Sequence, residues 1–404
     1  MSLPPLTPQQ LVKPPRFELR LGLIFAAIFL PMGLHLPYFP LWLEYCGFSA
    51  PEIAVILAGP MFLRVVTTPA ILTLADRAGD RADVLVALGA TSLALSAGYF
   101  LAPTYGIVLG VSLLLSVVWS PHVALTDSVA LSGVRRFGSD YSMMRIWGSV
   151  AYLSANFFGG LILAAAGEAI IPVLLSLSFA AVLAAAFLMP RLGPPRHASP
   201  LSTADLPDAV PSLMHPYFLA FVGSVGLTTA SHAYLYAFSS IYWKSLGISD
   251  ATVGLLWTVA VVGEVGVFMS FTRLFGRQSA ATTLVIAAVS SIVRWLAFPL
   301  VEPAGLGTAG FVAVQLLHAL STGLMLIGLQ KMIGETVGEA RTGAAQGVAY
   351  FATNFGLALA TLLSGPLYEA TGVDGFFAMA VLAAGGLALA LYARRSAPES
   401  RLRG

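Results

Sequence analysis

Residues 150–157 read VAYLSANF, and residues 348–355 read VAYFATNF, 198 positions later in a chain of 404. A second pair agrees, because residues 47–49 (GFS) return as residues 247–249 (GIS) after a shift of 200. Two well-separated matches with nearly the same shift indicate one duplicated unit of about 200 residues. In a chain dominated by apolar residues, two similar halves that enclose a site at mid-membrane are typical of a transporter.

The composition of the chain excludes an ordinary soluble domain. The mean hydropathy is +0.84, 57% of the residues are hydrophobic and only 10% are charged, whereas a soluble domain is about a quarter charged. The net charge of +2 gives no reason to expect a nucleic-acid partner. The single cysteine, Cys46, excludes an internal disulfide and a multi-cysteine metal site. No cleavable signal peptide is expected, because residues 1–15 carry five prolines and no apolar core.

Apolar stretches long enough to cross about 30 Å of hydrocarbon recur between short polar breaks. They predict an all-α membrane protein of twelve transmembrane helices, arranged as two six-helix pseudo-symmetric halves. A helix start is expected at Ser49, where a Ser cap and an early proline are followed by Glu52. The twelve predicted spans are 21–43, 51–74, 84–102, 105–131, 144–166, 169–189, 217–243, 251–273, 280–301, 307–333, 343–366 and 373–393.

The longest interior break, residues 190–216, is crowded with prolines and lies where a duplication needs a linker. We therefore expect an N-terminal half at 1–189, this linker, and a C-terminal half at 217–404. Basic residues predict the orientation. Of 21 Lys and Arg, 17 lie at the N-terminus, in the breaks after even-numbered spans, or in the C-terminal tail, all of which are expected on one side of the membrane. Lys244 alone lies in a break on the opposite side. Both termini and the linker are therefore expected in the cytoplasm.

Five ionisable side chains remain inside the predicted spans, and the functional argument depends on them. Unpaired, they would cost roughly 12–18 kcal/mol together, at about 2.5–3.5 kcal/mol each. They must therefore pair with one another, line water, or both. A purely structural protein has little reason to carry such a cost. The five are Arg64, Asp127, Arg145, Glu264 and Arg294.

Further polar residues lie three or four positions apart within the same spans, so they share a helix face with these charges. Such polar inner faces on four or five helices indicate a water-accessible cavity for a polar solute. The stripes are Arg145, Gly148, Tyr152, Asn156 and Gly159 in the fifth span, Ser116, Ser120 and Asp127 in the fourth, Thr228, His232, Tyr236 and Ser239 in the seventh, and Gln315, His318 and Thr322 in the tenth.

Packing explains some of these positions as well as function does. Small residues on a transmembrane face indicate close helix packing more often than solute contact. Tyr152 and Asn156 are equally consistent with interhelical hydrogen bonds, and Arg64 is equally consistent with a structural ion pair. His232 and His122 are as consistent with a packing hydrogen bond as with a proton carrier. With these alternatives open, the residues expected to bind the solute are Arg64, Asp127, Arg145, Trp147, Tyr152, Asn156, His232 and Trp257.

With twelve spans, duplicated halves and a central linker, the whole chain resembles the major facilitator superfamily. Residues 76–81 (DRAGDR) resemble its Asp-Arg-x-Gly-Arg-Arg signature, although Asp80 replaces a basic residue and Leu72 replaces the usual leading glycine. Residues 273–277 (RLFGR) are a degenerate counterpart in the second half. The signature implies an ion-paired cytoplasmic latch at the helix ends. Its residues here are Asp76, Arg77, Gly79 and Arg81.

Within that superfamily, the chain resembles the lactose permease-like branch that includes the 3-phenylpropionate permeases. The resemblance is carried by residues 36–42 (LPYFPLW), 75–77 (ADR), 145–149 (RIWGS), 294–295 (RW) and 315–318 (QLLH). In lactose permease an acid in span 4 and an arginine 18 residues later in span 5 bind substrate. Asp127 and Arg145 are also 18 residues apart.

The resemblance also implies a proton-coupling set. A glutamate in span 8, an arginine in span 9 and a histidine in span 10 serve binding and proton coupling in lactose permease, and Glu264, Arg294 and His318 match them by position. Lactose permease carries a second acid one turn past the histidine, where this chain has Ser321. The proton site of lactose permease therefore cannot be carried over to this chain in full. Glu264 is expected to take up and release a proton as an arginine, Arg145 or Arg294, approaches and withdraws.

These observations predict a proton-coupled secondary active transporter, a symporter, of a small polar or anionic solute at the cell inner membrane. Three arginines against two acids inside the spans leave a balance of +1, which favours an anion. Nearby aromatic side chains favour an aromatic carboxylate, such as a phenylpropionate-like acid. A sugar or nucleoside proton symporter is the alternative. A polytopic membrane enzyme is disfavoured because the short loops offer no reactive constellation, and a passive channel is a third option. We expect a monomer in the lipid bilayer whose partners are its solute and protons, with no cofactor and no metal.

Overall fold

The computed structural model describes residues 12–193, 212–337 and 339–396. The described residues are helical and include no strand. Their contacts divide the chain into two units. Unit 1 comprises Met1–Phe48 and Gly59–Leu201, and unit 2 comprises Ser49–Ala58 and Ser202–Gly404.

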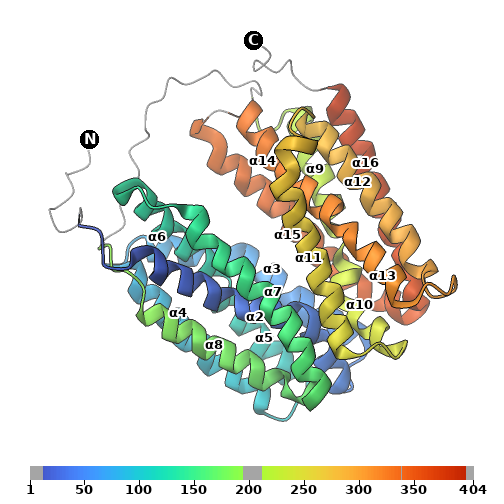
Figure 1. Cartoon of the computed structure of the whole chain (residues 1–404), viewed down its shortest axis with the longest axis horizontal. Coiled ribbons are helices and arrows are strands. Elements are labelled where there is room, and N and C mark those ends of the chain that lie inside the picture. The colour runs from blue at the N-terminus through green and yellow to red at the C-terminus, as the bar shows by residue number, and fades with distance from the viewer. Residues whose placement is uncertain (1–11, 194–211, 338, 397–404) are drawn as a thin grey trace. The chain divides into compact units, whose positions relative to one another are not determined.

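Helices account for nearly all of the described part of unit 1, and helix α2 lies at its centre. α2 packs against α7, α8 and α6, while α4 packs against α8 and α5 (Figure 1). Helix α3 begins in unit 2 and continues into unit 1. The helices are α2 (Phe17–Tyr45), α3 (Ala50–Ala75), α4 (Arg81–Ser96), α5 (Tyr105–Trp119), α6 (Pro121–Phe137), α7 (Tyr141–Ala166) and α8 (Ile171–Phe187), with short 3₁₀ turns η1 (Ala97–Phe100) and η2 (Glu168–Ile170).

In unit 2, α9 packs against α15 and α16, and α12 packs against α16 and α14 (Figure 1). The helices are α9 (Pro216–Ala230), α10 (Ala233–Ser245), α11 (Asp250–Leu274), α12 (Ala280–Ala297), α13 (Gly307–Leu316), α14 (Leu324–Thr336), α15 (Glu339–Thr371) and α16 (Gly375–Arg395). The shorter turns are η3 (Phe298–Leu300), the π-helical turn η4 (Ala319–Gly323) and η5 (Gly372–Asp374).

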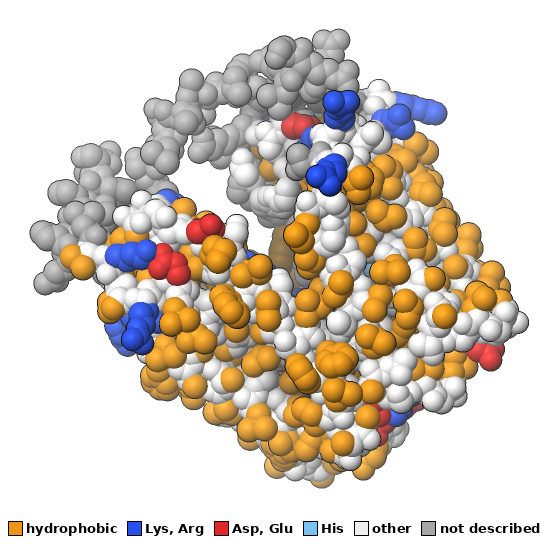
Figure 2. All heavy atoms as spheres, viewed as in Figure 1, with side chains coloured by type: hydrophobic (Ala, Val, Ile, Leu, Met, Phe, Trp, Pro, Cys, Tyr) orange, Lys and Arg blue, Asp and Glu red, His pale blue; other side chains and the backbone are white. Residues whose placement is uncertain are grey.

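Eleven segments of the described chain are long and apolar enough to cross a membrane. The last of them, Ala344–Arg395, is 52 residues long and contains most of α15 and all of α16. The two predicted spans 343–366 and 373–393 fall in this one segment, so the count of twelve spans stays a prediction. Figure 2 shows hydrophobic side chains over the flanks of both units and charged side chains near the helix ends, as a lipid-facing surface requires.

Local sequence explains where several helices begin. The predicted start at Ser49 is confirmed, because Glu52 Oε2 accepts hydrogen bonds from the backbone N–H and the hydroxyl of Ser49, at 2.9 and 2.8 Å. Asp140 caps α7 by accepting the N–H groups of Ser142 and Met143. Residues 194–211 of the predicted linker lie outside the described residues, and its cytoplasmic position stays a prediction.

Three of the spans are interrupted near their middles. Tyr105–Phe137 is broken at Ser120, just before Pro121, whose ring cannot continue a helix from the preceding turn. Pro216–Ser245 is broken at Ser231 and His232, and Gly307–Thr336 contains the π-helical turn η4. Interruptions of this kind frequently mark functional sites in membrane helices, and the polar residues of unit 2 gather at the second and third of them.

Candidate functional site

The break between α9 and α10 is produced by polar side chains that compete with the backbone. The Thr228 carbonyl, which a continuous helix would use internally, accepts from Ser231 Oγ at 2.7 Å and contacts His232 Nδ1 at 2.9 Å. The His232 N–H then bonds to Thr229 in a tighter turn. The bend divides the predicted stripe of the seventh span. His232 faces the other polar residues of the unit, whereas a Cβ added at Gly386 of α16 would lie 2.6 Å from Thr228 Oγ1.

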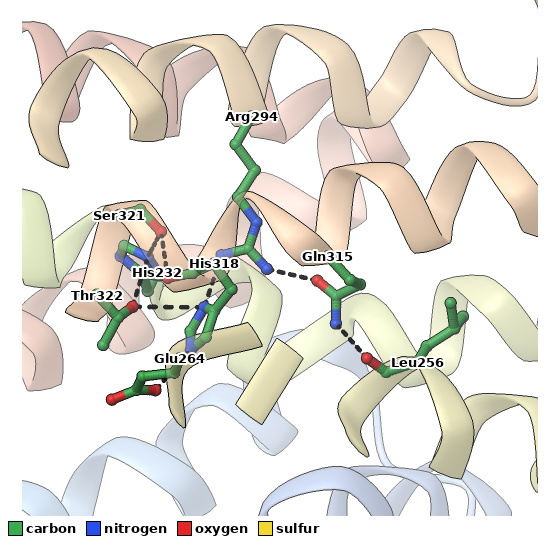
Figure 3. A network of polar contacts seen from close by, with 8 residues as sticks. All are labelled: His232, Leu256, Glu264, Arg294, Gln315, His318, Ser321 and Thr322. Carbon is green, nitrogen blue, oxygen red and sulfur yellow. Dashed lines mark hydrogen bonds and ion pairs between the residues drawn. The ribbon is translucent and has the colours of Figure 1, made fainter. Parts of the chain in front are cut away.

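A polar network around Arg294 of α12 lies at this level of unit 2 (Figure 3). Arg294 Nη1 lies 2.8 Å from His318 Nδ1, and Arg294 Nη2 donates to Gln315 Oε1. Gln315 in turn donates to the Leu256 carbonyl at 3.2 Å. On the far side of the imidazole, His318 Nε2 lies 3.8 Å from Glu264 Oε2. We call Glu264, Arg294, Gln315, His318, Ser321, Thr322 and His232 the Arg294 network.

Arg294 is fully buried and has no direct carboxylate partner in the part of the chain that the structure describes. Its side chain is 0% exposed, and its guanidinium carbon lies 4.6 Å from the ring centre of Trp295. Its Nε atom has no hydrogen-bond partner among the described residues. The expected approach of Arg294 to Glu264 is therefore indirect, because His318 lies between the cation and the acid (Figure 3). A buried charge that depends on neutral partners is sensitive to any proton added to them.

The contacts assign the tautomers of both histidines. Arg294 can only donate, so His318 Nδ1 accepts, and the ring proton of neutral His318 is on Nε2 toward Glu264. His232 Nδ1 faces the Thr228 carbonyl, which can only accept, so His232 Nε2 is its acceptor. Ser321 Oγ lies 3.2 Å from that nitrogen, and Thr322 Oγ1 lies 3.4 Å from His232 Nε2 and 3.4 Å from His318 Nδ1. Thr322 therefore bridges the two rings.

A cavity of about 310 Å³ lies next to the network within unit 2. Its described lining includes no Asp, Glu, Lys or Arg, and it shares Thr322 and His232 with the Arg294 network. The lining residues are Val225, Thr229, His232, Tyr236, Thr322, Met325, Leu326, Leu329, Gln346, Ala349, Tyr350, Thr353, Asn354 and Leu357. The cavity thus combines hydroxyl and amide groups with an apolar wall, the usual composition of a small-molecule site.

In unit 1, Asp127 and Arg145 are linked through a third residue. Tyr141 donates its hydroxyl to Asp127 Oδ1 at 2.8 Å, and no salt bridge joins Asp127 to Arg145 among the described residues. The Arg145 guanidinium carbon instead lies 4.1 Å from the ring centre of Phe29 and 5.6 Å from that of Phe25, both on α2. Arg145 is therefore held by aromatic faces, and its hydrogen-bonding edge is not occupied by the acid.

The other predicted solute-binding residues are placed differently. Asn156 is fully buried and donates to the Tyr152 carbonyl at 2.8 Å, while Tyr38 of α2 donates to the Asn156 carbonyl. The first contact lies within α7, and the second joins α2 to the backbone of Asn156, so the roles of the Tyr152 and Asn156 side chains stay a prediction. Trp147 is 51% exposed, and its ring lies against Gly22 of α2.

Two further predicted residues lie close to polar partners. Trp257 is buried and donates to Ser240 Oγ at 3.0 Å, so it supports α10 and is absent from the cavity lining. Arg64 is half-buried on α3 in unit 1, near His35. His122 is fully buried, with Nδ1 2.9 Å from the Trp119 carbonyl.

Sequence reasoning missed Tyr141 and His35. Tyr141 lies four positions before Arg145, so it extends the fifth-span stripe by one turn and was recognisable from the same periodicity. His35 stacks on Phe39, with ring centres 4.4 Å apart, and meets Trp119 of α5 at 5.3 Å. Leu34 and Leu36 flank it in the sequence, which hides it among packing positions.

Among the residues of the predicted latch, Asp76 and Arg81 form an ion pair. Arg81 Nη2 and Nε contact Asp76 Oδ1 at 2.5 and 3.2 Å, joining the end of α3 to the start of α4. Asp80, which departs from the superfamily signature, has its own role. Its two carboxylate oxygens accept the N–H groups of Ala82 and Gly193, at 2.8 and 2.7 Å. Asp80 therefore caps α4 and fixes the chain that leaves unit 1 after α8.

We expect Asp76→Asn to slow turnover and to shift the resting population toward inward-open, while solute affinity changes only a few-fold. The pair is partly exposed and contributes about 0.2–1 kcal/mol, which limits the shift to about fivefold. Thiol labelling of a single cysteine placed at the periplasmic mouth measures it. Asp83→Asn is the control, because Asp83 pairs with Arg191 at 2.6 Å outside the latch. Unchanged labelling in Asp76→Asn would mean that the loop sets topology only.

Comparisons with known proteins agree with this architecture. A model of the MFS_1-like family matches residues 19–379. The chain is 28% identical over 370 residues to the probable 3-phenylpropionic acid transporter of Escherichia coli (strain K12), covering 90% of this chain and 94% of that protein. It is 27% identical over 282 residues to the maltose permease of Geobacillus stearothermophilus, covering 68% and 69%.

Solved transporter structures share the fold. The crystal structure of the nucleoside transporter NupG superposes with a TM-score of 0.73 at 16% identity, covering 94% of this chain and 98% of that chain. A POT family transporter in complex with 5-aminolevulinic acid gives 0.71 at 11% identity, covering 94% and 96%. The family is one of membrane transporters, not of enzymes. The protein is a multi-pass membrane transporter that belongs to the MFS_1-like family of the major facilitator superfamily.

Proposed function

We propose that the chain is a proton-coupled symporter of a small anionic solute, with an aromatic carboxylate as the solute class. The observation that carries this proposal is the buried Arg294, which contacts a neutral His318 whose other nitrogen faces Glu264. A proton that reaches either partner changes how the arginine is satisfied. Such a network can therefore convert protonation into a change of structure.

The solute class is supported by charge and by one relative. The predicted spans hold one more arginine than acids, and the Escherichia coli relative is named for 3-phenylpropionic acid. Arg145, held between α2 aromatics, has an edge that can bind a carboxylate. We further propose that the protein acts as a monomer in the inner membrane with both termini in the cytoplasm.

A sugar or nucleoside proton symporter is the second candidate. The observation that favours it is the unit 2 cavity, whose described lining offers hydroxyl and amide groups and no Asp, Glu, Lys or Arg. Such groups suit a polyhydroxylated neutral solute. The relatives named for maltose and for nucleosides belong to the same set of comparisons.

Calorimetry of the purified protein tests both candidates. Titration with 3-phenylpropionate, maltose and uridine, in buffers of different ionisation enthalpy, measures affinity and the protons taken up on binding. We expect binding of 3-phenylpropionate with proton uptake, and an affinity that weakens up to about tenfold per unit rise in pH. Binding of uridine or maltose alone would establish the second candidate, and pH-independent binding would contradict symport.

Transport itself is measured in proteoliposomes with the inside alkaline. One pH unit supplies about 1.4 kcal/mol per proton, enough for about tenfold accumulation at one proton per solute. Undissociated 3-phenylpropionic acid crosses lipid unaided, so initial rates are compared with protein-free liposomes at about pH 8, where that form is scarce. A rate no higher than that of the empty liposomes would contradict the proposal.

A further inference from the structure

The Arg294 network and the unit 2 cavity meet at one hydroxyl group. Thr322, at the π-helical turn η4, lines the cavity and lies 3.4 Å from both His318 Nδ1 and His232 Nε2. Figure 3 shows it between the two histidines, on the Glu264 side of the network. His232 also lines the cavity, but its contact with His318 is ring to ring, with centres 5.6 Å apart.

The hydrogen-bond roles of Thr322 depend on the protonation of His318. With His318 neutral, its Nδ1 accepts from Arg294, and His232 Nε2 is also an acceptor. The Thr322 hydrogen is then drawn to one of the two nitrogens and away from the cavity. When His318 gains a proton on Nδ1, that N–H can no longer face Arg294, because two donors cannot bond to each other. It donates to Thr322 Oγ1, and Arg294 moves off the ring.

A protonated His318 leaves the Thr322 hydrogen free for a solute. Ser321 Oγ lies 3.2 Å from both His232 Nε2 and the His318 carbonyl to which it donates, and its hydrogen can turn from that carbonyl to satisfy His232 in place of Thr322. In that state His318 donates to Thr322, and Thr322 donates to an acceptor atom of a solute in the cavity. Hydrogen bonds in such a chain strengthen one another, and the charge on the imidazolium strengthens both.

We propose that Thr322 is the residue through which protonation of His318 promotes binding of a solute that places a hydrogen-bond acceptor, such as a carboxylate oxygen, in the unit 2 cavity. This inference rests on the proposed proton symport and names the contact that couples the two ligands. Thr322 is a positioning residue in this scheme, since it passes the change at His318 to the solute. The coupling is reciprocal, so the solute also favours proton uptake by His318.

The groups that face His318 from the packed elements are few. Glu264 comes from α11, Arg294 from α12 and His232 from the break between α9 and α10, with Tyr236 of α10 next to His232. Each of these stays in place when the Thr322 hydroxyl alone is removed. A change in the pH dependence of solute binding after that removal is therefore caused by loss of the Thr322 bridge and not by loss of a titrating group.

The test compares Thr322→Val, Thr322→Ser and Thr283→Val by calorimetric titration with 3-phenylpropionate across pH. Valine keeps the shape of threonine and removes the hydroxyl, and serine restores it. Thr283 is the matched control, because it is a fully buried threonine of the same unit that donates to the Ala280 carbonyl of its own helix at 2.7 Å and is absent from the described cavity lining.

We expect Thr322→Val to bind about tenfold more weakly at low pH, the scale of one charge-assisted hydrogen bond, with little dependence on pH. Thr322→Ser and Thr283→Val should keep the wild-type pH profile and proton uptake. A wild-type profile in Thr322→Val, or an equal loss in Thr283→Val, overturns the inference and leaves the proposed function standing. Failure of the wild-type protein to take up a proton on binding, or to bind 3-phenylpropionate, overturns both.

Discussion

Replacing Glu264 by glutamine (Glu264→Gln) is expected to abolish proton-driven uptake while leaving solute exchange near the wild-type rate. Glutamine keeps the shape of the side chain but is fixed in a neutral state. Glu264 is the one acid within 4 Å of His318 among the described residues, so the network loses its site for an exchangeable negative charge. Under a gradient of one pH unit, the initial rate of 3-phenylpropionate uptake is expected to fall to that of protein-free liposomes, which the undissociated acid still crosses. Initial rates above those of protein-free liposomes, and counterflow from preloaded vesicles, measure the two activities.

Glu335→Gln is the control for this substitution. Glu335 lies 3.8 Å from Lys331, the same separation as Glu264 from His318, but on α14 and outside the network. It should transport as the wild type does. A Glu264→Gln protein that still accumulates solute would place the coupling acid elsewhere, and Asp127 is the next candidate. Loss of both accumulation and exchange would make Glu264 a binding residue instead.

The repeat that indicated a duplicated chain corresponds to repeated local structure. Asn156 and Asn354 each donate to the carbonyl of the tyrosine four residues earlier, at 2.8 and 3.0 Å. Gly47 and Gly247 both have left-handed backbone, with φ of 84° and 77°. Hydropathy and capping residues predicted helices and their ends because both depend on neighbours in sequence. The placement of one half against the other has no such local signal.

The Arg294 network was only partly predictable. Periodicity placed Gln315, His318 and Thr322 on one face, and all three do contact the network. The order of contacts was not predictable, because it depends on which atoms of separate helices meet. Arg145 was the expected partner of Glu264, with Arg294 as the alternative. Of the two, Arg294 is separated from Glu264 by His318, and the approach of Arg145 stays a prediction. The breaks near His232 and His318 arise without proline, through side-chain bonds and a π-helical turn that composition does not reveal.

Asp127 and Arg145 show the same limit in unit 1. Their spacing of 18 residues suggested a pair, but Tyr141 bonds to the acid and the arginine lies on aromatic rings. The charge of a residue is readable from sequence, while its partner is set by packing. Arg145 consequently keeps an edge for a ligand that a direct salt bridge would have consumed.

Arg145→Lys is expected to weaken binding of 3-phenylpropionate by about tenfold or more while the protein stays folded. Lysine keeps the positive charge, but it loses the planar fork that binds a carboxylate through two donors and the flat face that lies 4.1 Å from Phe29. The affinity should still depend on pH, because the Arg294 network lies in unit 2 and is unaltered. Calorimetric titration measures the affinity and its pH profile together.

Arg135→Lys is the control that distinguishes the loss of a solute-binding arginine from the loss of an arginine elsewhere in unit 1. Arg135 lies in the last turn of α6, and among the described residues it bonds only to the Leu131 carbonyl of its own helix, at 3.3 Å, so its replacement should leave affinity unchanged. Near-normal binding by Arg145→Lys would remove Arg145 from the solute site and leave it a packing partner of α2. Weaker binding with a lower thermal midpoint would also indicate packing. Weaker binding at an unchanged thermal midpoint is the result that only contact between Arg145 and the solute explains. A weakening caused by lost stacking on Phe29 would instead destabilise the folded protein and lower its thermal midpoint.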